Sequence, residues 1–314
     1  MRQSKNAFTS KETFYSMISV SLKGISQVAL IENAISGFII LIAITISSYY
    51  LGIMTLASSI IGTLIGKVGG ADENSVRAGL YGYNSVLTGI ALTIFLTESS
   101  KWIIALFGAA FAAILSAAMM HFMKNTAIPI LTFPFIILTW FMLLTSYRLK
   151  AFQLNTALVP QSLVHWKLNI AGEIDWTEGI FNGIGQIFFL ANTISGVLLF
   201  VALFWAGWRF GLYAILGNTI SLLTAYGLGG EHSLILMGLY GYNAILTALA
   251  VSLVFKDKNN RFAPLIGIIA ACFTVPLTAS ISTWLLPYGL PALTMPFVLS
   301  TWLFLGARKV LPKF

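Results

Sequence analysis

The feature that most constrains the fold of this chain is an internal duplication. Residues 128–135, Ile-Pro-Ile-Leu-Thr-Phe-Pro-Phe, return as residues 290–297, Leu-Pro-Ala-Leu-Thr-Met-Pro-Phe. Each copy runs into an apolar segment that reaches a tryptophan at the same distance, Trp140 in one case and Trp302 in the other. A motif repeated together with its surroundings indicates that the chain consists of two related halves.

Identical residues elsewhere place the two halves in register. The sequence Gly-Leu-Tyr-Gly-Tyr-Asn occurs at residues 79–84 and again at residues 238–243, an offset of 159 (238 − 79). The same offset joins Gly24 with Gly183, Gln27 with Gln186, Asn33 with Asn192, and Ser36 with Ser195. At the later motif the offset is 162 (296 − 134). We therefore divide the chain into a first repeat at 1–160, with a basic amino-terminal arm and a linker, and a second repeat at 161–314.

Composition assigns the chain to the polytopic membrane proteins. Hydrophobic residues make up 58% of it and charged residues 9%, whereas a soluble domain contains roughly 25% charged residues. Apolar segments suited to a bilayer recur in both halves. We expect spans at about 33–51, 52–67, 79–97, 102–122 and 132–147, and at about 192–207, 211–228, 238–255, 262–286 and 294–307.

Two further apolar segments, at about 14–31 and 180–190, are too polar or too short to span and are interpreted as re-entrant helices, one in each repeat. The segments that follow the repeated motif are also short, about 15 residues or roughly 23 Å of helix, against a hydrocarbon core of about 30 Å. They are therefore expected to begin inside the membrane, with Thr132 and Thr294 as helix caps. The predicted fold is all-α, with about five spans and one re-entrant helix per repeat.

The charge distribution orients this fold. Five spans are an odd number, so the second repeat must be inverted relative to the first. With both termini in the cytoplasm, the net charge of +8 is explained by basic loops on the inner side and requires no nucleic acid partner. The inner residues are Arg2, Lys5, Lys11, Lys23, Lys67, Arg77, Lys124, Arg209, Lys256, Lys258, Arg261, Arg308, Lys309 and Lys313. The outer ones are only Lys101, Arg148, Lys150 and Lys167.

The reactive side chains do not support an enzyme. The chain has a single cysteine, Cys272, and no spacing typical of a metal site, a nucleotide loop or a nucleophile–base pair. We therefore expect no enzymatic activity, metal or cofactor. The three histidines have no histidine counterparts in the other repeat, which argues against the hypothesis that the chain is an ammonium channel. Glu32 has Ala191 as its counterpart and is interpreted as a loop or cap residue rather than a proton relay.

Neutral polar residues that occur in pairs are the strongest candidates for a pathway. Gln27 and Gln186 could join helices, as amides often do in membranes, but a related pair on elements too short to span favours lining a pore. Thr132 and Thr294 could cap their helices or face the same passage. The paired tyrosines and leucines are more typical of packing.

At these residues the chain resembles the urea transporter family, which includes bacterial urea channels. The motif at 290–297 matches the Leu-Pro-x-x-Thr-x-Pro-Phe signature of that family completely, and the copy at 128–135 departs only at Ile128. The segments 24–27 and 183–186 also look like the paired segments that precede its pore. The resemblance covers about residues 15 to 306.

The resemblance implies a channel-like urea pathway in each protomer of a homotrimer in the cytoplasmic membrane. It implies a narrow selectivity filter lined by Gln27, Gln186, Thr132 and Thr294. It also implies a wall of apolar and aromatic groups, at Leu30, Tyr83, Leu87, Phe189, Tyr242 and Leu246. The alternatives are an ammonium or small-amide transporter of another mechanism and, from a different class, a receptor or structural membrane protein.

Overall fold

The computed structural model describes residues 10–156, 158–256 and 260–311. These residues form helices joined by loops, with one isolated bridge between Leu96 and Leu154. The all-helical prediction is therefore confirmed. Four of the basic residues assigned to the inner side lie outside the described residues: Arg2, Lys5, Lys258 and Lys313.

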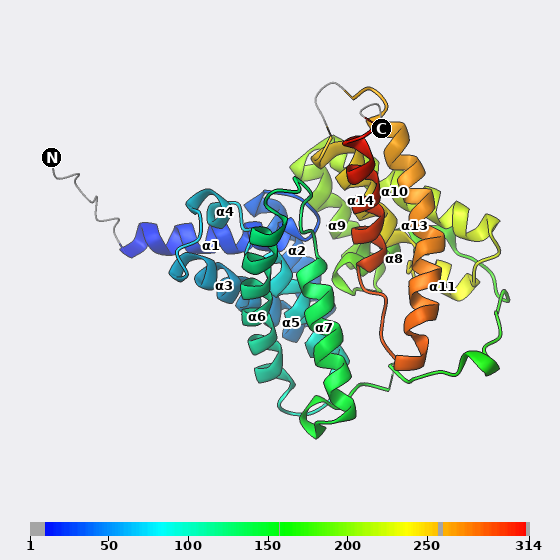
Figure 1. Cartoon of the computed structure of the whole chain (residues 1–314), viewed down its shortest axis with the longest axis horizontal. Coiled ribbons are helices and arrows are strands. Elements are labelled where there is room, and N and C mark those ends of the chain that lie inside the picture. Colours follow the sequence, from blue (N-terminus) through cyan, green and yellow to red (C-terminus); the bar gives the residue numbers. More distant parts are fainter. Residues whose placement is uncertain (1–9, 157, 257–259, 312–314) are drawn as a thin grey trace.

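The helices of the first half lie on the left of Figure 1, and those of the second half lie on the right. The first half contains α1 (Ser10–Gln27), α2 (Ala34–Ser47), α3 (Tyr49–Val68), α4 (Glu73–Arg77), α5 (Tyr83–Phe95), α6 (Lys101–Met123) and α7 (Phe133–Leu144). The second half contains α8 (Trp176–Gly185), α9 (Thr193–Ala206), α10 (Trp208–Gly227), α11 (His232–Leu236), α12 (Gly241–Leu249), a π-helix (Ala250–Val254), α13 (Ala263–Leu285) and α14 (Met295–Arg308).

Each expected span overlaps one of these helices, but the helices differ in length. Among the described residues, three are long and apolar enough to cross a membrane: α3, α6, and α13 with its extension to Tyr288. The segments Trp176–Phe188 and Thr193–Ala206 form a pair bent by 73°, the geometry of a broken span or a re-entrant loop. Several apolar helices of this kind support a multi-pass membrane protein.

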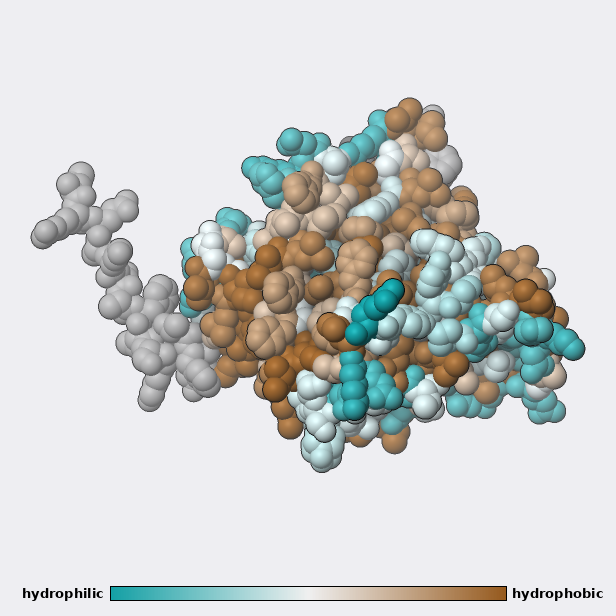
Figure 2. Space-filling view, turned by 60° about the horizontal axis from the view of Figure 1, so that its bottom comes forward, coloured by the Kyte–Doolittle hydropathy of each residue, from teal (hydrophilic) through white to brown (hydrophobic). Residues whose placement is uncertain are grey.

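The surface agrees with this class. Large hydrophobic side chains are exposed along several of these helices, including Ile53, Phe107 and Trp284. Figure 2 shows brown, hydrophobic residues over much of one face, with hydrophilic residues gathered in separate patches. An apolar surface of this extent fits contact with lipid better than contact with water.

The two halves meet through α2 and α9 in a reciprocal contact. The hydroxyl of Ser36 donates to the carbonyl oxygen of Ala202 (2.8 Å), and the hydroxyl of its counterpart Ser195 donates to the carbonyl oxygen of Ala43 (2.9 Å). Since 202 − 43 is also 159, the two bonds are equivalent when the halves are exchanged. Such a self-complementary contact is typical of a twofold relation.

Glycines allow α1 to cross the loop before α5 at close range. Gly79 has a φ of +80°, and a Cβ at this position would lie 2.5 Å from the backbone nitrogen of Gly24. In the second half, Gly238 has a φ of +72° and would approach Gly183 in the same way. Only glycine adopts this backbone conformation without strain and leaves room for the crossing. The crossing brings the carboxyl end of α1, with Gln27, beside this loop.

Candidate functional site

A cavity of about 410 Å³ lies against the first copy of the repeated motif. It brings together four residues predicted from the sequence: Gln27, Leu30, Tyr83 and Thr132. Two phenylalanines of the second half, Phe255 and Phe297, also line it. The cavity therefore lies between the repeats.

The two glutamines make equivalent hydrogen bonds. The Nε2 of Gln27 donates to the carbonyl oxygen of Ala78 (3.0 Å), and the Nε2 of Gln186 donates to that of Met237 (3.1 Å). Each bond anchors the amino group to the loop crossed by the preceding helix. No donor among the described residues bonds the Oε1 of Gln27. At the cavity, this amide oxygen can accept hydrogen bonds from a ligand.

Left-handed backbone conformations follow both glutamines. Leu30 has a φ of 63° and its counterpart Phe189 a φ of 60°. The residues before the two threonines behave alike, with φ values of 50° at Leu131 and 51° at Leu293. Bulky residues rarely adopt this conformation, which clusters at functional sites. Leucine and phenylalanine carry no turn signal, so these bends could not be predicted from the sequence.

The tyrosine and asparagine of the repeated Gly-Leu-Tyr-Gly-Tyr-Asn sequence hold the carbonyl before each threonine. The hydroxyl of Tyr83 donates to the carbonyl oxygen of Leu131 (2.8 Å), and that of Tyr242 donates to Leu293 (2.6 Å). The side chain of Asn243 donates to the same oxygen of Leu293 (3.2 Å). The tyrosine hydroxyls therefore fix the motif, and Tyr83 also presents its side chain to the cavity.

The two threonines bond each other. The Oγ1 atoms of Thr132 and Thr294 lie 2.7 Å apart, and the residues are 2% and 3% exposed. Both threonines occupy the N-cap position as expected, but neither side chain makes a capping hydrogen bond, so the alternative that their hydroxyls cap the helices is wrong. Each helix has proline at its second position and so lacks that N–H, and the next N–H in α14, at Phe297, is bonded to the Oδ1 of Asn243 (3.2 Å).

Tryptophans join each motif to the opposite half. The indole Nε1 of Trp140 donates to the carbonyl oxygen of Pro291, and that of Trp302 donates to the carbonyl oxygen of Pro129, both at 2.8 Å. No role for these indoles was predicted from the sequence. The signal was present, however, because both tryptophans stand at the same distance from their motif.

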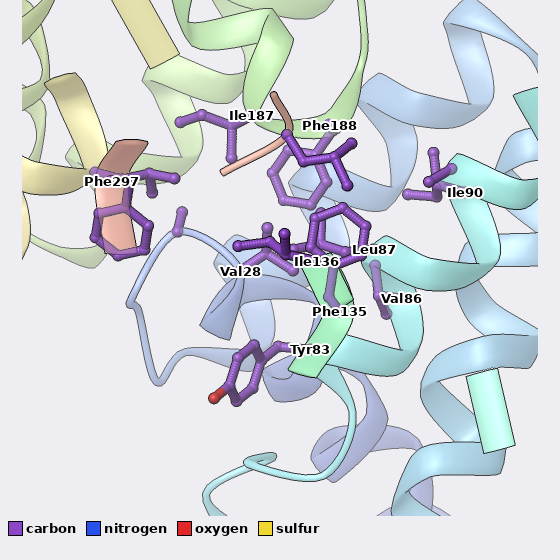
Figure 3. Close-up of a cluster of buried hydrophobic side chains, with 14 of the residues drawn as sticks. Val28, Tyr83, Val86, Leu87, Ile90, Phe135, Ile136, Ile187, Phe188 and Phe297 are labelled. Atoms are coloured by element: carbon purple, nitrogen blue, oxygen red, sulfur yellow. The ribbon is translucent and has the colours of Figure 1, made fainter. Parts of the chain in front are cut away.

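The remaining predicted residues lie outside the lining of this cavity. Leu87 and Leu246 are almost completely buried in the main hydrophobic core. Figure 3 shows Leu87 among packed side chains that include Phe135 and Phe188. Phe189 packs its ring against Phe95 and Phe135. The roles of these residues, of Gln186 and of Tyr242 in a pathway stay predictions.

Charged groups are sparse around the site. Glu32, in the loop after α1, pairs with Lys23 of that helix at 2.8 Å in a partly exposed ion pair, as expected of a loop residue. Lys124 also lines the cavity. Among the described residues no three His, Cys, Asp or Glu side chains gather where they could hold a metal ion.

Comparison with known proteins agrees with the motifs. Residues 18–309 match the profile of the family described as "Urea transporter". The chain is 26% identical to urea transporter 1 of Ovis aries over 313 residues, which cover 97% of this chain and 80% of the relative. Urea transporter 1 of Mus musculus is 24% identical, with the same coverage. Since the profile spans nearly the whole chain and both copies of the motif, the chain belongs to the urea transporter family.

Proposed function

We propose that this protein conducts urea down its concentration gradient through a narrow filter between the two repeats. Membership of the urea transporter family makes it a transport protein and not an enzyme. The observation that carries the channel proposal is the meeting of the repeated motifs, where Thr132 and Thr294 bond each other beside a cavity. Uncharged polar groups from both halves would thus form one path.

Urea needs acceptors to leave water. It is a flat, neutral molecule with four N–H donors and one carbonyl acceptor, and moving an amide into a medium without partners costs roughly 4–8 kcal/mol. The Oε1 of Gln27 and the hydroxyls of Thr132 and Thr294 would replace water as acceptors along the path. Gln186 would play the part of Gln27 on the other side of the threonines. The substrate would keep hydrogen bonds at each stage.

The two flat faces of urea, in contrast to its edges, need apolar contacts. The side chains of Leu30 and Tyr83 line the cavity, and Phe297 borders it from the other half. Phe189, Tyr242, Leu87 and Leu246 complete the proposed wall. A slot bounded by such groups admits a planar solute and offers few partners to water.

Cations would be disfavoured by two features. The helices α7 and α14 begin at the threonines, and their amino-terminal ends carry partial positive charge. The cavity lining includes one cation, Lys124, and no acidic residue among the described side chains. An uncharged substrate moving without an ion gradient agrees with this electrostatic arrangement.

In the membrane, we infer two inverted repeats of five spans and one re-entrant helix each, with both termini cytoplasmic. The proposed location is the cell (cytoplasmic) membrane, and the proposed assembly is a homotrimer with a pathway in each protomer. The charge bias of the loops and the reciprocal serine bonds between α2 and α9 support the inverted relation.

Flux measurement tests this function. Purified protein in liposomes should speed urea equilibration, followed by stopped-flow light scattering, with no ion or pH gradient present. The reason is that the proposed filter binds a neutral amide and lacks acidic residues that could couple it to protons. Empty liposomes provide the baseline. A strict requirement for a proton or sodium gradient would contradict the channel and favour a coupled amide or ammonium transporter.

A further inference from the structure

The carboxyl end of α12 differs from its counterpart in the first half. The π-helix at Ala250–Val254 follows α12, whereas the equivalent residues 91–95 complete α5 as a regular α-helix. The backbone N–H of Phe255 donates to the carbonyl oxygen of Ala250 (2.9 Å), which closes this wider turn. Single π-turns in helices are frequent at functional sites. The two halves therefore depart from their symmetry at this turn.

Arg308, the last residue of α14, holds this turn. Its Nη2 donates to the carbonyl oxygen of Val251 (2.6 Å) and its Nη1 to that of Phe255 (3.0 Å). Arg308 was expected among the solvated cations of the inner loops, but the residue is only 7% exposed. Carbonyls at a helix end carry partial negative charge, and the planar guanidinium can bond two of them at once.

The residue that Arg308 holds is also a wall of the cavity. Phe255 lines it together with Gln27 and Leu30. In the first half, the position equivalent to Phe255 is Leu96, which is buried in the core, and the position equivalent to Arg308 (308 − 162) is Ser146. The arginine, the π-turn and the phenylalanine therefore form one hydrogen-bonded unit in the second half, and the equivalent described residues of the first half do not form it.

We propose that Arg308 is a positioning residue for size selection. By holding the carbonyls of Val251 and Phe255, it fixes the π-turn so that Phe255 narrows the cavity and limits the bulk of the amide that enters. This inference rests on the proposed function, because it takes the cavity as part of the urea path. Arg308 acts through Phe255 and makes no contact with the substrate.

The test measures selectivity between urea and N,N′-dimethylurea in liposomes. Phe255→Ala removes the wall and should raise the permeability of dimethylurea relative to urea about tenfold, since a methyl group in a fitted pocket is worth roughly that factor. Arg308→Met releases the turn and should raise the same ratio by about threefold to about tenfold. Arg308→Lys keeps the charge but cannot make both hydrogen bonds to the two carbonyls at once. Its permeability ratio of dimethylurea to urea should therefore lie between those of wild type and Arg308→Met.

Matched variants separate positioning from charge and from folding. Lys309→Gln removes the same charge from the next, exposed residue and should leave the ratio unchanged. Combining Arg308→Met with Phe255→Ala should give the ratio of Phe255→Ala alone, because the arginine acts through that ring. Should Arg308→Met fail to fold, Arg308→Lys and Phe255→Ala still decide the matter.

Two results would overturn the proposal: a wild-type ratio in both arginine variants that fold, or effects of Arg308→Met and Phe255→Ala that multiply independently. A wild-type protein that passes no urea would instead contradict the proposed function. The two failures are therefore distinguishable in one set of measurements.

Discussion

At the scale of single residues, the two threonines occupy helix N-cap positions, but their side chains bond each other instead of the helix ends. Proline at the second helical position removes the N–H that a capping hydroxyl would bond. Neither hydroxyl is bonded to its helix end, and the two Oγ1 atoms lie 2.7 Å apart between buried residues. Burying a hydroxyl without a hydrogen bond costs free energy, and here each threonine hydroxyl bonds the other.

Thr294→Val should lower urea permeability at least tenfold, or about 1.4 kcal/mol in the barrier, because it replaces an acceptor by a methyl group and orphans Thr132. Stopped-flow urea flux, normalised to protein in the liposomes, measures it. Thr301→Val, on the same helix, is the control. Thr301 is also buried, and its hydroxyl has no hydrogen bond among the described residues. Equal flux in Thr294→Val and wild type would remove the threonine pair from the path.

The sequence identified residues that recur in both repeats but not the contacts they make. Gln27, Thr132 and Tyr83 were found through their counterparts, and the structure brings all three to one cavity. The tyrosine–carbonyl and tryptophan–proline bonds join residues far apart in the chain, so no local pattern could show them. The buried position of Arg308 was not predicted, because a cation at the end of a helix is ordinarily solvated.

At the scale of elements, the crossing of α1 over the loop before α5 positions the pathway candidates. The crossing sets the backbone of Gly24 against that of Gly79, and the amide of Gln27 bonds the same loop at Ala78. The repeated sequence Gly-Leu-Tyr-Gly-Tyr-Asn predicted the importance of this region. Its physical reason, a backbone approach too close for any side chain, became visible only in three dimensions.

Gly79→Ala should destabilise the protein by about 2 kcal/mol or more, because it adds a left-handed alanine and drives a methyl group into the backbone of Gly24. Thermal unfolding in detergent measures the loss. Gly70→Ala is the matched control: its φ is +73° and nothing lies within 4 Å of the added carbon. Gly70→Ala should lower the free energy of unfolding by only about 1 kcal/mol, the cost of the left-handed backbone conformation for alanine. Equal melting temperatures of the two variants would contradict a tight crossing.

At the scale of the whole molecule, the two halves are built alike but differ locally. The reciprocal serine, tryptophan and threonine contacts all relate one half to the other by the same exchange. The proposed number and direction of the spans rest on the loop charges and on the parity of each repeat, and both can be tested directly.

Asn74 and Ser233 test the inversion because they are counterparts (233 − 74 = 159) and are both exposed. Cys272→Ser gives a background without cysteine, into which Asn74→Cys or Ser233→Cys is introduced. A membrane-impermeant maleimide applied to intact cells should label position 233 and spare position 74, since inverted repeats place them on opposite sides. Labelling after lysis is the control for reactivity. Labelling of both positions in intact cells would contradict the inverted arrangement.

The tryptophan bonds also bear on how such a chain evolved. Because each indole binds the proline carbonyl of the opposite half, neither copy completes its own motif. A single-copy ancestor would have satisfied these groups by pairing with a second molecule of itself. A change in either copy would therefore disturb a bond made by the opposite half, whereas Glu32 and Ala191, which differ between the halves, take no part in these bonds.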